Sequence, residues 1–151
     1  MIHLEPITAD NYRECMRLKV LDSQTTLVAP NSKSLAEAYV YYNSSRTFAI
    51  YNDEVMIGFG LLRELENLQC YYISQFMIDE HHQGHGYGKQ AMTILIDDLR
   101  KEKKYLNIDL CYVEGDEGAK HLYESLGFVP TGEVEANEVL MRLHLTPARP
   151  K

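Results

Sequence analysis

The feature that most limits how this chain can fold is a turn at residues 83–89, in which three glycines alternate with larger residues. It reads Gln83-Gly84-His85-Gly86-Tyr87-Gly88-Lys89. Alternate glycines allow a tight turn and leave several backbone N–H groups exposed. A strand-like run ends at Ile78 and an amphipathic helix is expected over residues 86–103, so the turn opens that helix. The N–H groups and the positive end of the helix dipole predict an anion-binding site.

Two familiar phosphate-binding motifs do not fit this turn. The dinucleotide motif G-x-G-x-x-G would place its third glycine at position 89, which is lysine. A P-loop would need glycine at position 83 and Ser or Thr at position 90, and both positions hold glutamine. A flexible loop with structural glycines stays open as an alternative from these residues alone.

Three histidines beside the turn, His81, His82 and His85, raise the question of a metal site. No carboxylate or thiol lies at a suitable spacing, and a turn does not hold three imidazoles in a fixed geometry. We therefore expect no metal, with the histidines facing solvent and His85 near the bound anion.

The length and composition are those of one globular domain. The chain has 151 residues, of which 45% are hydrophobic and 25% are charged. No stretch is apolar enough to span a bilayer, and the first residues lack a signal-peptide pattern. The three cysteines, Cys15, Cys70 and Cys111, are far apart and odd in number, so we expect reduced thiols and a cytoplasmic location.

The net charge of -7 bears on the partners of the protein. An acidic surface repels nucleic acid and anionic membranes and favours a cationic partner. Many acidic proteins carry such charge simply for solubility, so charge alone leaves the partner open.

Residue patterns along the chain predict a mixed sheet with helices on both faces, in the α/β (α+β) class. Strands are expected over residues 1–7, 48–51, 55–63, 69–78, 106–112, 128–132 and 138–145. Helices are expected from Thr8 or Asp10 to about residue 21, over residues 34–43 with Ser34 as cap, over residues 86–103, and from Asp116 to Gly127. Residues 22–33 form a polar loop.

The chain resembles the GNAT N-acetyltransferase family through two motifs. Gln83, Gly86 and Gly88 match its Q/R-x-x-G-x-G/A turn, and Leu122-Tyr123-Glu124-Ser125-Leu126-Gly127-Phe128 matches L-Y-x-x-x-G-F. The element order also agrees. The resemblance implies one GNAT domain over residues 1–146, with a mostly antiparallel sheet whose central strands splay apart, and a frayed tail at 147–151. The run at residues 76–80 is similar to bacterial spermine/spermidine acetyltransferases.

The resemblance implies acetyl-CoA as the cosubstrate, without a metal. The strand backbone would pair with the pantetheine arm, and the turn would cradle the pyrophosphate. The residues implied in cofactor binding are Phe76, Met77, Ile78, Gln83, Gly84, His85, Gly86, Tyr87, Gly88, Lys89 and Asp116. Tyr123 would protonate the departing thiolate, although a tyrosine on the apolar side of a helix is also an ordinary core residue. Asp116 is expected to cap its helix as well.

The general base is left unassigned. Where relatives often carry a carboxylate in the strand before the turn, this chain has Ser74 and Gln75, and where they often have asparagine it has Glu114-Gly115-Asp116. Glu114 is a candidate to orient a water chain, with a solvated strand-end carboxylate as the alternative. The three cysteines have no recognisable activating partner in the sequence, which disfavours a covalent acyl-enzyme.

The expected reaction is direct acetyl transfer to a primary amine, such as spermidine or spermine. The alternatives are a degenerate module that binds acyl-CoA or an amine, and an enzyme that acetylates a protein or an N-terminus. The 22–33 loop has the length of a lid over a small pocket, which favours a small acceptor. The expected partners are a small cationic amine and, as an assembly, a second copy in a homodimer.

Overall fold

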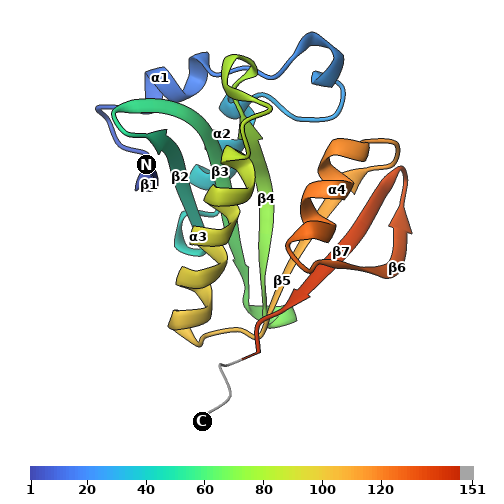
Figure 1. Cartoon of the computed structure of the whole chain (residues 1–151). Helices are drawn as coiled ribbons and strands as arrows, with labels where there is room; N and C mark the ends of the chain where they lie inside the picture. Colours follow the sequence, from blue (N-terminus) through green and yellow to red (C-terminus); the bar gives the residue numbers. More distant parts are fainter. Residues whose placement is uncertain (147–151) are drawn as a thin grey trace.

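The predicted strands form one seven-stranded sheet in the computed structural model, which describes residues 1–146 (Figure 1). The predicted tail, residues 147–151, lies outside the described residues. The strand order is β1-β2-β3-β4-β5-β7-β6. The strands are β1 (Ile2–Pro6), β2 (Ser45–Asn52), β3 (Val55–Leu65), β4 (Cys70–Ile78), β5 (Asn107–Val113), β6 (Val129–Glu135) and β7 (Glu138–His144).

The sheet divides at its centre. Each neighbouring pair of strands is antiparallel except β4 and β5, which run parallel. That parallel pair is short, because residues 71–73 of β4 meet residues 108–110 of β5 and the strands then diverge (Figure 1). The pairing of β4 with β3 skips Ser74, which bulges at the same point. The predicted mostly antiparallel sheet with splayed central strands is confirmed.

Helices cover both faces of the sheet, as predicted. Cys15 of α1 (Tyr12–Arg17) and Leu35 of α2 (Asn31–Val40) pack on one face, against a core that includes Phe59. The other face packs against α3 (Tyr87–Glu102) and α4 (Glu117–Ser125). The buried stripe of α3 has helical spacing, with Ala91, Met92, Leu95, Ile96 and Leu99. Within residues 1–146, no helix is both long and apolar enough to cross a membrane.

The first helix is shorter than predicted, because tertiary contacts pull the chain out of it. Helix α1 ends at Arg17 rather than near residue 21. Two residues later the backbone of Lys19 bonds the end of β4: its N–H donates to Asp79 Oδ1 at 2.9 Å, and its C=O accepts from Glu80 N–H at 2.7 Å. The predicted caps were also wrong, since Asn11 stands at the N-cap.

Helix α2 begins at Asn31, three residues before the predicted start. Pro30 precedes it in an extended conformation (ψ 148°), and Ser34 is buried inside the helix rather than capping it. The start and the end predicted for α4 are confirmed. The Asp116 side chain accepts the Ala119 N–H at the start of α4, and Gly127 follows the helix with φ 98°.

We expect Gly60→Ala to destabilise the fold. Gly60 lies opposite Phe48 in the β2–β3 pairing, and a Cβ atom there would overlap the Phe48 ring. Forcing extra volume into a packed core costs about 1–3 kcal/mol. Chemical denaturation should show this loss of unfolding free energy.

Gly118→Ala provides the opposite control. It lies in α4, and its added Cβ would meet only Asp116 Oδ1, at 3.7 Å. It should stabilise by about 0.5–1 kcal/mol. Equal stability of Gly60→Ala and the wild type would contradict the packing of Phe48 on Gly60.

Candidate active site

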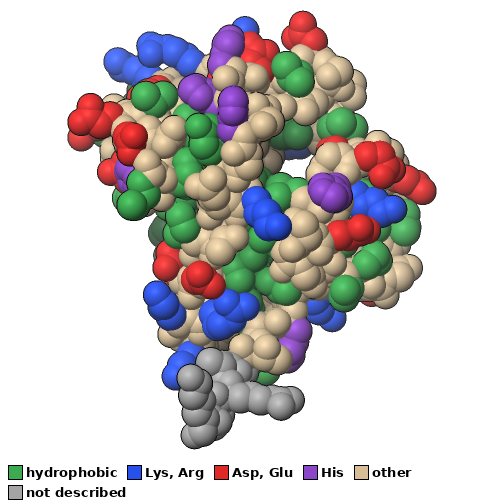
Figure 2. Space-filling view, in the orientation of Figure 1, with side chains coloured by type: hydrophobic (Ala, Val, Ile, Leu, Met, Phe, Trp, Pro, Cys, Tyr) green, Lys and Arg blue, Asp and Glu red, His purple; other side chains and the backbone are tan. Residues whose placement is uncertain are grey.

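A cleft of about 550 Å³ opens where β4 and β5 separate, between the start of α3 and α4. Figure 2 shows this side of the molecule, hollowed between the two helices. Four groups of residues line the cleft: the end of β4, the glycine turn, one side of α4 and the segment after α1. They are Phe76, Met77, Ile78, His82, Gln83, Gly84, Gly86, Tyr87, Gly88, Lys89, Asp116, Gly118, Ala119, His121, Leu122, Tyr123 and Ser125, with Val20, Gln24 and Val28 from the segment after α1.

The glycine turn leaves its backbone donors unused. Gly84 and Gly86 have φ of 83° and 78°, the left-handed region that suits glycine, and no side chain caps α3. No backbone N–H from residue 83 to residue 89 donates a hydrogen bond to an acceptor within residues 1–146. A Cβ on either glycine would meet no atom within 4 Å. The turn therefore offers a row of free donors beside open space, which fits a bound pyrophosphate.

Side chains tie this turn to the segment that follows α1. Gln83 Nε2 donates to the Ile78 carbonyl and to Gln24 Oε1, both at 2.9 Å, and Gln24 Nε2 donates back at 3.2 Å. Asp79 binds the same segment through Lys19. Burial opposes ionisation of Asp79, but hydrogen bonds from Lys19 and His81 outweigh it and lower the pKa of the carboxyl. An ionised Asp79 thus anchors this segment at Lys19, and Gln83 anchors it at Gln24.

Tyr123 is buried on the inner side of α4 and faces the point where the strands diverge. Its ring packs against Phe128, with 5.9 Å between ring centroids. Burial raises the pKa of the Tyr123 phenol well above its usual value, and the Asp116 carboxylate adds to the rise. The phenol therefore keeps its proton at neutral pH and can act as a donor.

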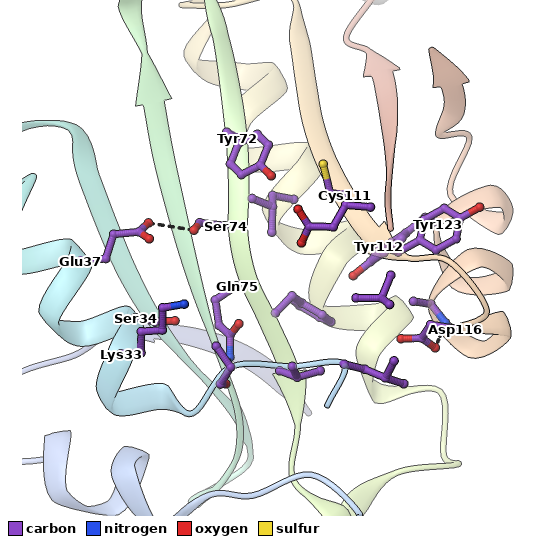
Figure 3. Close-up of a pocket in the computed structure, with 18 residues that line it drawn as sticks. Lys33, Ser34, Glu37, Tyr72, Ser74, Gln75, Cys111, Tyr112, Asp116 and Tyr123 are labelled. Atoms are coloured by element: carbon purple, nitrogen blue, oxygen red, sulfur yellow. Dashed lines mark hydrogen bonds between the residues drawn. The ribbon is translucent and has the colours of Figure 1, made fainter. Parts of the chain in front are cut away.

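A second cavity, of about 320 Å³, continues from the cleft on the α2 side of the sheet. The two share the lining residues Val28, Phe76, Asp116, Ala119 and Tyr123. Three carboxylates and one lysine line the second cavity: Glu37, Asp116, Glu138 and Lys33. Figure 3 shows Glu37 and Ser74 on one side of β4, with Asp116 and Tyr123 across the divergence. This excess of negative charge suits a cation.

The predicted lid forms part of the wall of the second cavity. Leu27, Val28 and Ala29 line it. Gln75 Nε2 donates to the Ala29 carbonyl at 2.8 Å and to Asn31 Oδ1 at 3.4 Å, and so holds the segment against β4. Gln75, which cannot act as a base, thus has a structural task here.

The cleft gathers most of the cofactor residues that the sequence analysis named. His85 is the exception, since it lines neither the cleft nor the second cavity. Glu114, the candidate to orient a water chain, lines neither as well, and its side chain is exposed. Sequence reasoning missed Gln24, Glu37 and Glu138. The lid-length loop was a signal for the first, but no motif marks the two glutamates.

Two of the three histidines beside the turn, His81 and His85, contact different residues. His81 Nδ1 is 3.1 Å from Asp79 Oδ2, and the His85 ring stands 5.4 Å from that of Tyr87. Over the part of the chain that the structure describes, no cluster of three His, Cys, Asp or Glu side chains is placed to hold a metal ion.

The cysteines are poor nucleophiles. Burial raises the pKa of all three thiols, that of Cys15 to about 12. A thiol attacks as the thiolate, which a raised pKa makes scarce at neutral pH. Cys111 lines the second cavity, and the same reasoning applies to it. This environment disfavours a covalent acyl-cysteine intermediate.

The divided sheet and its cleft, taken with the family match, define a class, the N-acetyltransferases that take their acetyl group from acetyl-CoA. The chain belongs to the acetyltransferase (GNAT) family, whose family model matches residues 12–128.

Individual relatives within the family differ in what they acetylate. A spermine/spermidine N(1)-acetyltransferase of Bacillus subtilis strain 168 is 28% identical over 144 residues, covering 90% of this chain and 93% of the relative. A spermidine N-acetyltransferase of Vibrio cholerae, solved with CoA and spermine, superposes with a TM-score of 0.77 at 19% identity, covering 95% of each chain. The ribosomal-protein-S18-alanine N-acetyltransferase of Escherichia coli reaches 0.75 at 19% identity, covering 99% of this chain and 97% of that one. The fold alone therefore leaves the acceptor undecided.

Proposed function

We propose that this protein transfers an acetyl group from acetyl-CoA directly to a primary amine of a small polycation such as spermidine or spermine. The observation that carries the proposal is the meeting of two cavities at Tyr123, one with free backbone donors and the other with excess carboxylates. The polyamine relatives support the acceptor class. The cytoplasmic location and the homodimer stay predictions, the former supported by three free cysteines.

The cofactor would lie along the cleft. N–H groups of the turn would bind the pyrophosphate. The edge of β4 that faces β5 has no partner strand beyond Ile73 among the described residues, and it would pair with the pantetheine arm. Acetyl-CoA supplies the activated acetyl group. Backbone amides at the divergence would polarise the carbonyl, and Tyr123 would give a proton to the sulfur. Glu114 stays a candidate for ordering water at the end of β5.

The amine must lose a proton before it can attack. With a pKa near 10.4, forming the neutral amine at pH 7 costs roughly 4–5 kcal/mol. An acidic cavity attracts the cation but also stabilises its proton, so a specific proton acceptor is needed.

The decisive test is an acceptor panel with acetyl-CoA, read as free thiol released. Spermine, spermidine, a monoamine of similar length and a peptide with a free N-terminus should be compared. Thiol release with the polyamines supports the proposal. Release only with the peptide would assign a protein acceptor, and CoA binding without release for any amine would indicate a binding module.

We expect the Michaelis constant for a polyamine to rise with salt more steeply than that for a monoamine. Each ammonium group gains attraction from the carboxylates of the second cavity, and salt screens exposed charges over about 8 Å at physiological strength. Three other acidic residues do not serve this role, since Asp22, Glu64 and Glu66 do not line the cavity, and Glu64 is paired with Lys104 at 2.7 Å. Measuring KM for both acceptors at two ionic strengths is the check; equal responses would exclude a polycation site.

A further inference from the structure

The three carboxylates of the second cavity have different surroundings. Asp116 already accepts the Ala119 N–H as the cap of α4. Glu138 lies exposed at the first residue of β7. Glu37 is held in one place: its Oε2 accepts the Ser74 hydroxyl at 2.8 Å, and its side chain is only 33% exposed. Glu37 is therefore the carboxylate with both a fixed position and a partly desolvated setting.

The Glu37–Ser74 hydrogen bond lies where the central strands separate. Pairing between β4 and β5 ends at Ile73, so Ser74 is the first residue of β4 beyond the pair, and it is also the bulged residue opposite β3. The cofactor cleft and the second cavity share Phe76 and Tyr123 just beyond this point. Figure 3 shows the bond reaching from α2 to β4 beside the divergence. Glu37 therefore lines the cavity that adjoins the cleft, on the α2 side of the divergence.

One oxygen of Glu37 remains available. Within residues 1–146, Oε1 accepts no hydrogen bond, while Oε2 serves Ser74 and lies 3.9 Å from Arg63. A carboxylate with a free oxygen on the cavity can receive an ammonium N–H in a charge-assisted hydrogen bond. The other charged or titratable groups that line this cavity are Lys33, Tyr72, Cys111, Tyr112, Asp116, Tyr123 and Glu138.

We propose that Glu37, oriented by Ser74, binds the ammonium group of the acceptor and removes its proton. This rests on the proposed amine acetylation. The ammonium gives a proton to the Glu37 carboxylate, and the nitrogen lone pair forms the C–N bond at the acetyl carbonyl. The C–S bond then breaks with its electrons going to sulfur, the thiolate takes a proton from Tyr123, and the nitrogen loses its second proton to solvent to give the neutral amide. Partly exposed, Glu37 returns its proton to solvent, and the tyrosinate is reprotonated from solvent.

The test compares kcat and KM among glutamate variants with spermine as acceptor. Glu37→Gln keeps the shape but removes the proton acceptor, so kcat should fall about 100-fold. Affinity for CoA by calorimetry should not change. Glu37→Asp should recover part of the rate. Glu138→Gln removes the same charge from the same cavity and should raise KM without lowering kcat, whereas Glu14→Gln on the exposed face of α1 controls for net charge.

Ser74→Ala gives a second test that leaves every charge in place. It removes only the hydroxyl that orients Glu37, and kcat should fall about tenfold. Thermal unfolding checks that each variant is folded, since Glu37 also lies near Arg63. The proposal is overturned if Glu37→Gln affects only KM, as Glu138→Gln does, or if Ser74→Ala keeps the wild-type kcat. Absence of thiol release by the wild type with any amine would instead refute the proposed function.

Discussion

Replacing Gly86 by aspartate is expected to weaken CoA binding by about 100-fold or more. The substituted Cβ would meet open space within the row of free N–H groups, where the pyrophosphate is proposed to bind. Two like charges about 4 Å apart repel by roughly 4 kcal/mol in a partly screened site, and a 100-fold loss corresponds to about 2.8 kcal/mol. Titration calorimetry with CoA is the measurement.

Gly86→Asn is the matched control for this experiment. Gly86 has φ 78°, so any side chain there strains the turn, but asparagine and aspartate tolerate that conformation to a similar degree. Their difference therefore isolates the charge. We expect Gly86→Asn to bind CoA within about tenfold of the wild type. Equal affinities for the two variants would remove the turn from the cofactor site.

Removing the hydroxyl of Tyr123 is expected to lower kcat about 100-fold, the usual scale for losing a positioned acid. The phenol stays protonated at neutral pH because burial raises its pKa. Burial also raises the proton affinity of a thiolate leaving in the same cavity, so the two pKa values move in the same direction. In Tyr123→Phe the ring still packs on Phe128, and affinity for CoA should be retained.

Tyr105→Phe controls for the loss of a buried phenol elsewhere. Tyr105 is buried against Tyr71, with 5.1 Å between ring centroids, and lines neither the cleft nor the second cavity. Single-turnover rates of thiol release for both variants, with thermal unfolding alongside, separate proton transfer from packing. A Tyr123→Phe rate close to that of Tyr105→Phe would mean that water or another group protonates the sulfur.

Features that depend on neighbouring residues were predictable. The turn is local, because alternate glycines before an amphipathic helix determine a tight bend and a helix start. The cap at Asp116 and the stop at Gly127 depend on residues within one or two turns of α4. Strand alternation likewise reflects burial on one or both faces of the sheet.

Features that depend on distant residues were not predictable. Helix α1 stops early because Asp79 and Glu80, some 60 residues away, bind Lys19. Gln75 holds the lid through the Ala29 carbonyl. In the sequence this residue was notable only because relatives often carry a carboxylate in this strand. Each of these contacts joins two segments that are far apart in the sequence, and the residue pattern within either segment does not indicate the other.

The sequence by itself determined the family and the mixed sheet with helices on both faces, and it named the glycine turn as a candidate anion site and Tyr123 as a candidate acid, since motifs and short-range patterns carry that information. Only the tertiary structure decided which carboxylates meet at the divergence of β4 and β5. Glu37 reaches Ser74 across 37 residues, and Glu138 comes to the same cavity from β7. Their meeting follows from sheet order and from the bulge at Ser74, which long-range packing sets.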